Sequence, residues 1–447
     1  MTEYKHSVSL DKSKCKGCTH CLQRCPTEAI RVREGCAAIN PQKCIDCGEC
    51  IRVCPYKAKK ATHDRLDSLS KYKYKIALPA PALYGQFDNL DDIDFVVQGL
   101  YDMGFDDVFE VAKAAEMVSG YTRQYLRGDN IGKPVISSAC PVVVRLISMR
   151  FPFLCKNILP ILPPVEVAGK AAREKALREH PELSDKDIGC FFISPCPAKV
   201  SYVKNAFAGS ESSVDEVLSV SDVYFELVGR MNKITVPEKS TEAGTVGVSW
   251  ATAGGESTAI FNERYLAADG IENVIRVLDQ IENSDFPELE FVELNACNGG
   301  CVGGVMTVAN PYIAKARIHS LKRYLPVSPN FRPGSGELSS GVKMPEVEYI
   351  PQTPLSDDRS EAMRMMADIQ EIRKDLPDLD CGSCGAPTCA AFAEDIVRGE
   401  ACADECVVFM RHVFHDYIQR HVSQSKETAD GQENSKGGGD GDGNGEA

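Results

Sequence analysis

From residue 73 onward, short apolar runs alternate with longer runs whose apolar residues have helical spacing, and this alternation predicts an α/β fold. Short apolar runs such as Tyr74–Ala77 and Asp107–Val111 have the length of β-strands. Longer runs with helical spacing follow them, at Leu90–Met103 and Ala114–Leu126. Strands that alternate with helices are typical of α/β units around a mainly parallel sheet. We therefore expect the central part of the chain to be α/β.

The pattern changes toward both ends, and the cysteines follow the same divisions. Nine cysteines lie between Cys15 and Cys54, six between Cys140 and Cys301, and five between Cys381 and Cys406. The stretch Pro329–Pro354 is rich in Pro, Gly and Ser, which is typical of a connector. The final residues contain almost nothing apolar and are expected to be disordered. The expected divisions are 1–70, 71–327, a linker at 328–357, 358–424 and a tail at 425–447.

Composition narrows the class of protein. A chain of 447 residues with a net charge of −14 is a poor candidate for binding a phosphate backbone, so we expect no nucleic-acid partner. No apolar run has the length of a membrane span, and the first residues contain no apolar signal core. We expect a cytoplasmic protein without membrane insertion. In that compartment twenty cysteines indicate metal or cluster ligation, because thiols there stay reduced.

The first cysteine group contains an internal repeat. Cys-Lys-Gly-Cys-Thr-His-Cys-Leu-Gln-Arg-Cys-Pro is followed by Cys-Ile-Asp-Cys-Gly-Glu-Cys-Ile-Arg-Val-Cys-Pro. This is bacterial ferredoxin spacing, in which three thiolates hold one 4Fe-4S cluster and the fourth cysteine ligates the other. A pair of zinc knuckles is the alternative, which the Cys-Pro ending of each half disfavours. The expected ligands are Cys15, Cys18, Cys21 and Cys54 for the first cluster, and Cys44, Cys47, Cys50 and Cys25 for the second.

Three central segments share a design in which an apolar run ends in a small or polar residue and then a cysteine. These cysteines are Cys140, Cys196 and Cys297. Because the carboxyl ends of parallel strands face a common crevice, the three thiolates could converge on one ligand. The third segment continues through two glycines to Cys301, which adds a fourth thiolate in a loop that allows close backbone approach. Structural cysteines would explain any one segment, but hardly all of them together.

These motifs resemble those of the iron-only (FeFe) hydrogenases, over Lys73–Pro326. The matching signatures are Ser-Ser-Ala-Cys-Pro at 137–141, Ser-Pro-Cys-Pro-Ala-Lys at 194–199, and Phe-Val-Glu-Leu-Asn-Ala-Cys-Asn-Gly-Gly-Cys-Val-Gly-Gly at 291–304. The resemblance implies an H-cluster domain of two α/β lobes, preceded by an α+β ferredoxin-like domain. It also implies the H-cluster itself, a 4Fe-4S cluster joined to a two-iron unit that carries CO, cyanide and a dithiolate. The implied ligands are Cys140, Cys196, Cys297 and Cys301, of which Cys301 bridges to the two-iron unit.

The resemblance implies a ferredoxin-type hydrogenase that interconverts H2 with protons and electrons. H2 and protons would be the substrates, a redox protein such as ferredoxin the electron partner, and maturation proteins the source of the two-iron unit. Lys199 matches a family lysine that donates to a cyanide ligand, an anionic acceptor that suits an ammonium. The ordinary alternative is a solvated lysine. Pro195, directly before Cys196, is assigned to the same site.

The sequence also departs from the family. Ala139 occupies the position of a cysteine that passes protons, and Ser257 stands where a methionine near the two-iron unit is common. The carboxylates of Glu256 and Glu293 suggest a substitute proton route, in which both act as acid-base relays if burial raises their pKa. The alternative for each is a solvated or salt-bridged glutamate.

The last cysteine group resembles the small C-terminal 4Fe-4S module of anaerobic redox proteins and of hydrogenase-like sensory chains. A helical run, Arg359–Lys374, precedes it, so we expect a small helical module. A zinc site is the alternative. The expected ligands are Cys381, Cys384, Cys389 and Cys406, with Cys402 as the other candidate for the fourth position.

Three functions remain open. The first is a slow hydrogenase, and the second is an H2 sensor of groups C and D that a signalling partner reads out. The third is a hydrogenase-like electron-transfer or cluster-assembly protein without the two-iron unit. Ala139 and the C-terminal module favour the sensory branch, whereas Lys199 and Cys301 argue against the third function. Clusters at both ends predict two electron ports.

Overall fold

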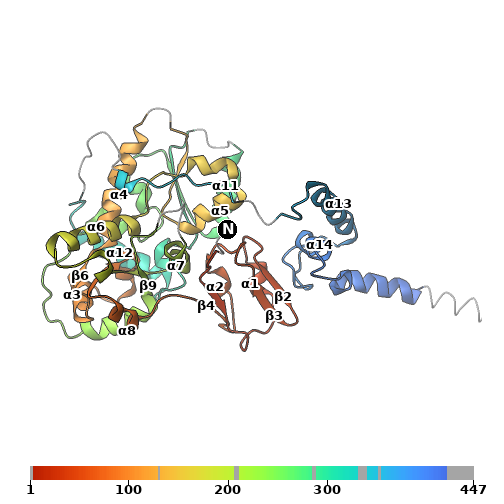
Figure 1. Ribbon diagram of the computed structural model, residues 1–447, viewed down its shortest axis with the longest axis horizontal. Coiled ribbons are helices and arrows are strands. Elements are labelled where there is room, and N and C mark those ends of the chain that lie inside the picture. Colours follow the sequence, from red (N-terminus) through yellow and green to blue (C-terminus); the bar gives the residue numbers. More distant parts are fainter. Residues whose placement is uncertain are drawn as a thin grey trace, which may run out of the picture.

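The computed structural model describes residues 4–128, 131–205, 211–283, 288–330, 340–350 and 354–419. These residues form three modules, with the N-terminal module between the large α/β module and the C-terminal helices (Figure 1). The predicted mixed α/β class with parallel sheets is confirmed. Among the described residues no helix has the length and apolar character needed to cross a membrane. The tail expected at 425–447 lies outside the described residues.

The N-terminal module consists of two similar halves. Each half has a short helix that begins inside the cysteine repeat and carries its third cysteine, Cys21 or Cys50. The residues before these helices, Thr19 and Gly48, have positive φ angles of 62° and 79°, so the chain turns sharply between successive cysteines. The elements are α1 (His20–Gln23), α2 (Glu49–Arg52), and two antiparallel pairs, β1 (Val8–Leu10) with β4 (Lys59–Ala61) and β2 (Ile30–Arg33) with β3 (Cys36–Ile39).

The large module contains two separate parallel sheets. The four-stranded sheet has the order β6-β5-β8-β9, and the three-stranded sheet has the order β10-β11-β7. Parallel strands need crossover connections, which the intervening helices supply. The strands are β5 (Tyr74–Pro79), β6 (Asp107–Val108), β7 (Val135–Ile136), β8 (Ile188–Ser194), β9 (Glu216–Ser219), β10 (Tyr265–Asp269) and β11 (Phe291–Asn295).

Helices cover the sheets and fill the space between strand ends. The α-helices are α3 (Asp94–Asp102), α4 (Val111–Leu126), α5 (Pro141–Arg150), α6 (Pro164–Glu179), α7 (Pro197–Lys204), α8 (Val220–Met231), α9 (Thr245–Ser249), α10 (Gly255–Ala259), α11 (Ile271–Glu282) and α12 (Pro311–Leu321). The 3-10 helices are η1 (Leu66–Lys71), η2 (Pro81–Gln86), η3 (Pro152–Asn157), η4 (Asp185–Asp187), η5 (Cys301–Gly303), η6 (Lys322–Tyr324), η7 (Ser340–Val342) and η8 (Ala403–Glu405).

The predicted elements exist, but several of their limits differ. The strand expected over Asp107–Val111 ends at Val108, because Val111 already begins α4. Glu110, between them, is buried and accepts a hydrogen bond from the hydroxyl of Tyr84 at 2.9 Å, a long-range contact that the local pattern does not contain. The helix expected from Leu90 begins later, as α3.

Part of the expected linker packs on the large module. The backbone N–H of Leu162 donates to the carbonyl of Val342 at 2.9 Å, and that of Met344 donates to the carbonyl of Pro160 at 3.0 Å. The side chains of Val342 and Met344 are buried. Residues 340–350 therefore belong structurally to the large module.

The C-terminal module docks on β2 of the N-terminal module. Asp395, buried on α14 (Cys389–Val397), accepts hydrogen bonds of 2.7 Å from Arg31 Nε and from Arg33 Nη2. Nearby, the backbone N–H of Val32 donates to the carbonyl of Gly385 at 2.8 Å. Helix α13 (Arg359–Asp375), which was predicted, packs against α14, and a last helix at 407–419 projects outward (Figure 1).

Candidate functional site

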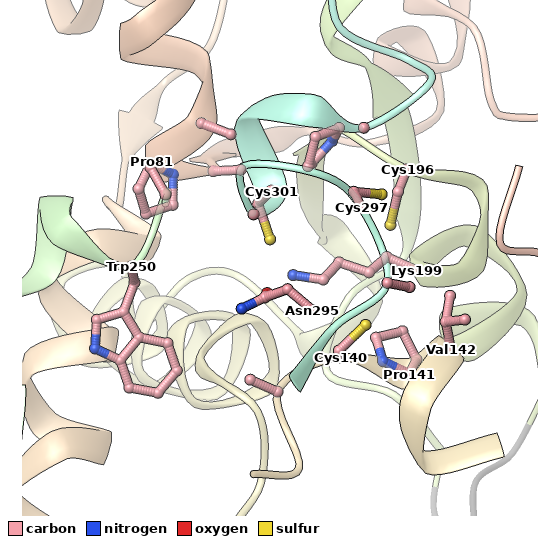
Figure 2. Close-up of a pocket in the computed structure, with 18 of the residues that line it drawn as sticks. Pro81, Cys140, Pro141, Val142, Cys196, Lys199, Trp250, Asn295, Cys297 and Cys301 are labelled. Atoms are coloured by element: carbon pink, nitrogen blue, oxygen red, sulfur yellow. The ribbon is translucent and has the colours of Figure 1, made fainter. Parts of the chain in front are cut away.

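A cavity lies where the two sheets of the large module meet. Cys140 follows β7, Cys297 follows β11 and Cys196 follows β8, so both sheets contribute to it. Cys301 begins η5. Figure 2 shows the four thiols around one space, with the side chain of Lys199 extending between them. The convergence expected of these strand ends is therefore present, but the crevice lies between two sheets and not along one.

Local backbone chemistry places the thiols. Cys140 and Cys196 each occupy the position before a helix whose first residue is Pro141 or Pro197, and proline favours that first position. In the third motif, a Cβ added at Gly300 would lie 2.4 Å from the backbone nitrogen of Ala253. The loop that presents Cys301 therefore requires glycine at this position.

Three of the four thiols, those of Cys196, Cys297 and Cys301, have raised pKa values and need a metal to remove their protons. Burial raises the pKa of Cys196 to about 12, although Lys199 opposes the rise, and burial raises the pKa of Cys297 well above its usual range. Burial and the neighbouring Cys140 also raise the pKa of Cys301. Iron deprotonates a coordinating thiol, and the iron-thiolate bonds offset the free-energy cost of burying the thiolates. A four-cysteine set in an enclosed cavity fits a 4Fe-4S cluster.

Lys199 lies at the cavity and not on a solvated surface. Burial by itself lowers the pKa of Lys199, but the thiolates of Cys301, Cys196, Cys140 and Cys297 more than offset this, so the pKa is raised. Its Nζ atom lies 5.6 Å from the ring centroid of Phe192, which forms part of the cavity wall. The side chain therefore offers a permanent cation to an anionic group in the cavity.

Glu256 and Glu293 are both buried beside the cavity, so neither is the solvated glutamate of the alternative interpretation. The hydroxyl of Ser137 donates to Glu256 at 2.6 Å. Glu293 accepts hydrogen bonds from the backbone N–H groups of Gly254 (2.9 Å) and Ser257 (2.8 Å). Burial raises the pKa of both carboxyls, and the charge of Glu293 raises that of Glu256 further. Both shifts favour the protonated form of the pair.

The remaining candidates differ in their positions. Ala139 and Pro195 line the cavity, and the backbone N–H of Ala139 donates to the hydroxyl of Ser137 at 3.1 Å. Ser137 therefore connects the backbone of Ala139 to Glu256. Ser257 is fully buried and is not among the lining residues, so it meets the site only through its backbone bond to Glu293.

Several lining residues were not foreseen from the sequence. Asn295 lines the cavity and donates to Glu293 through Nδ2 at 2.8 Å, and Trp250 forms another part of the wall (Figure 2). Asn295 stands inside the third cysteine motif, which was the available signal. Asp46 and Cys47 also line the cavity, although they belong to the N-terminal module. No pattern in the local sequence could have assigned Asp46 and Cys47 to this cavity.

The second ferredoxin-type set faces the cavity. Arg52, two residues after Cys50, donates to the carbonyl of Gly303 in η5 at 3.0 Å. Asp46 accepts a hydrogen bond of 2.7 Å from Ser201 on α7, the helix that carries Lys199. Burial raises the pKa of Cys50 to about 12. Cys44, Cys47, Cys50 and Cys25 therefore lie on the side of the module that meets η5 and α7.

The first set surrounds a separate space of about 340 Å³, lined by Cys15, Cys18, Cys21 and Cys54. Val32 also lines this space, and it is the residue whose backbone bonds Gly385 of the C-terminal module. The first set therefore lies next to the C-terminal module, and the second set lies next to the large cavity.

The C-terminal cysteines are divided by burial. Cys384, Cys389 and Cys406 pack in one apolar cluster with Phe392, whereas Cys402 is exposed. Burial raises the pKa of Cys384, and Cys406 adds to the rise, which places these two thiols near each other. Cys381 is exposed at the edge of the module. This arrangement favours Cys406 over Cys402 as the fourth ligand.

Comparison with models of protein families shows first the class of protein and then the family. A model for a 4Fe-4S dicluster domain matches residues 7–55, and the model FeS, for an Fe-S cluster, matches residues 376–408. The chain is an iron-sulfur protein. The model "Iron only hydrogenase large subunit, C-terminal domain" matches residues 73–261 and 243–305, which is more than half of the chain. The chain therefore belongs to the iron-only hydrogenase family.

Solved structures of FeFe-hydrogenases are similar at low identity. A variant of FeFe-hydrogenase HydA1 from Chlamydomonas reinhardtii has 16% identity and a TM-score of 0.48, covering 64% of this chain and 98% of that one. A structure concerned with oxygen inactivation of FeFe-hydrogenase has 16% identity and a TM-score of 0.46, covering 59% and 90%. The corrinoid/iron-sulfur protein large subunit of Moorella thermoacetica is 53% identical over 36 residues, which is only 8% of each chain.

Proposed function

We propose that this protein is a slow FeFe hydrogenase that binds an H-cluster in the large cavity and uses it to sense H2. One observation carries the proposal: four thiols and the ammonium of Lys199 converge on a single cavity. Thiolates suit the cubane, and the ammonium suits the anionic cyanide of a two-iron unit.

The chain's own residues would divide the work as follows. Cys140, Cys196, Cys297 and Cys301 would hold the cubane, and Cys301 would also help to hold the two-iron unit, which would supply the chemistry of H2 cleavage. Lys199 orients that unit by donating from Nζ. The glycine loop around Gly300 allows the backbone to approach closely. The walls of the cavity exclude bulk water, which strengthens these charge interactions.

Protons would leave through hydroxyl and carboxyl groups. Ala139 has no titratable group, but the hydroxyl of Ser137 lies directly behind it and donates to Glu256. A proton held on the carboxyl of Glu256 can pass toward Glu293, which bonds the partly exposed Gly254. This route passes through several groups where the family uses a single cysteine thiol. We therefore expect proton transfer, and with it H2 turnover, to be slow.

Electrons would travel along one line of clusters. The C-terminal module bonds the N-terminal module through β2, and the N-terminal module bonds η5 and α7 beside the cavity. The two predicted electron ports therefore lie on one path, with the C-terminal module at its outer end and the N-terminal module in its middle. A redox partner such as ferredoxin, or a signalling partner, would exchange electrons at the outer part of this path. The docked C-terminal module and Ala139 together favour the sensory branch.

The test loads the iron- and sulfide-reconstituted protein with a synthetic two-iron cofactor. Infrared bands of bound CO and cyanide are expected, together with slow H2 production from an artificial electron donor. Cys301→Ala should lose the bands, and Lys199→Met should bind the cofactor more weakly, with shifted cyanide bands. Absence of the bands in the unmodified protein would reject the hydrogenase and the sensor alike, and rapid turnover would reject the sensor.

A further inference from the structure

Lys59 is a buried lysine of the N-terminal module whose ammonium has no hydrogen-bond partner among the described residues. The residue is 3% exposed and lies on β4, paired with Leu10 of β1. A buried ammonium without an anion is costly, because burial removes its hydration. Something with negative charge must therefore meet Nζ in the functional protein.

The surroundings of Lys59 point to the iron-sulfur clusters as that anion. Lys59 lines the space formed by Cys15, Cys18, Cys21 and Cys54. The ammonium of Lys59 therefore borders the first set of thiols.

The internal repeat indicates that folding alone does not require a lysine here. Lys59 stands five residues after Cys54, and the same position in the other half, five residues after Cys25, is Ile30. Ile30 is 2% exposed and begins β2, as Lys59 begins β4. One half of the module fills this buried position with a hydrocarbon, so the charge in the other half serves a purpose other than packing.

We propose that Lys59 tunes the first of the two ferredoxin-type clusters, raising its reduction potential relative to that of the second. A cluster that accepts one electron gains one negative charge, and a nearby ammonium in a poorly hydrated site stabilises that reduced form. The electron comes from the redox partner, and no bond is made or broken. Because the first cluster is the one beside the C-terminal module, an electron rests near that module and away from the cavity.

This inference depends on the two clusters and not on H2 conversion, so the two proposals can fail separately. The test uses the full chain reconstituted anaerobically with iron and sulfide, without any two-iron unit. Iron and sulfide contents are measured, and the reduced clusters are followed by EPR during a potentiometric titration. The variants are Lys59→Ile, the residue of the other half, and Lys59→Met, with Lys59→Arg keeping the charge. Lys60→Ile, at the exposed neighbouring position, is the matched control.

Lys59→Ile and Lys59→Met should keep their iron and sulfide, and one reduction step should move to a more negative potential. The expected change is at least tenfold in the ratio of reduced to oxidised cluster at fixed potential, or about 59 mV for one electron. Lys59→Arg and Lys60→Ile should titrate like the unmodified protein. Unchanged potentials in both apolar variants would overturn the proposal. Loss of the clusters in both would overturn it as well, because Lys59 would then hold a cluster and not tune it.

Discussion

At the scale of single residues, the proposed proton route begins beside Ala139, which has no titratable group, and uses the carboxyl of Glu256 instead. Ala139 borders the cavity, and its backbone is bonded to Ser137, which is bonded to Glu256. Ala139→Cys places a thiol at the cavity wall and should raise H2 turnover of the cofactor-loaded protein at least tenfold, since general acid-base groups contribute about 10²–10⁴. Ala139→Ser, with a hydroxyl of much higher pKa, is the control. Equal rates for the three proteins would show that proton exit does not limit turnover.

Glu256 carries the proposed replacement route. Glu256→Gln keeps the shape of the side chain but removes its titratable proton, and the expected result is a loss of about 10²-fold in H2 turnover. The infrared bands should be unchanged, because the residue does not bind the cofactor. Glu290→Gln, which removes a partly exposed carboxylate paired with Lys133 away from the cavity, is the control. Full activity in Glu256→Gln would reject the route.

The same carboxyl should affect stability as pH changes. In the folded protein the pKa of Glu256 lies well above its ordinary value of 4.5, because of burial and then of the charge on Glu293. Above pH 4.5 the unfolded chain releases this proton and the folded chain retains it, so the free energy of unfolding falls as pH rises until the folded pKa is passed. Denaturant titrations at several pH values should show that the free energy of unfolding of Glu256→Gln falls less steeply with rising pH than that of the unmodified protein. An identical pH dependence in both proteins would mean that the carboxyl ionises freely when folded.

At the scale of elements, the contact between α14 and β2 holds the outer end of the proposed electron path. Asp395 is buried and bonds both Arg31 and Arg33, so Asp395→Asn should weaken the docking of the C-terminal module by about 2 kcal/mol. Limited proteolysis should release the module more readily. Glu394→Gln, which removes a pair with Arg398 and a longer pair of 4.0 Å with Lys43, both more exposed than Asp395, should have little effect. Equal digestion of the two variants would show that the backbone contact at Val32 suffices.

Elements differ in how well the sequence predicts them. Helix α13 and the strands before the three cysteine motifs follow from periodicity and length, because each carries its own local pattern. The limits of β6 and α3 were wrong, since a buried partner such as the Glu110–Tyr84 bond decides where a strand ends. Cysteine spacing predicted the members of each thiol group but not which groups adjoin. The contact of Arg52 with Gly303 joins residues about 250 positions apart, beyond any local signal.

At the scale of the whole molecule, the modules depend on their clusters to different degrees. The N- and C-terminal modules have small apolar cores to which the cysteines themselves contribute, whereas the large module has extended cores of its own. Removal of iron with a chelator should therefore unfold the two small modules and leave the α/β module folded. Proteolysis with mass spectrometry should recover a resistant fragment near residues 71–330. A single cooperative loss of the whole chain would contradict this independence.

The sequence by itself determined which cysteines form groups, which motif holds a glycine loop, that Lys199 accompanies Cys196, and that Ala139, which has no titratable group, precedes Cys140. Spacing along a chain is a local property, and ligand spacing and strand-to-helix turns are local as well. Only the tertiary structure decided that two sheets share the cavity, that Glu256 and Glu293 are buried together, and that the N-terminal module lies in the middle. It also decided the environment of Lys59, because burial and the partners of a charge depend on segments that are distant in sequence.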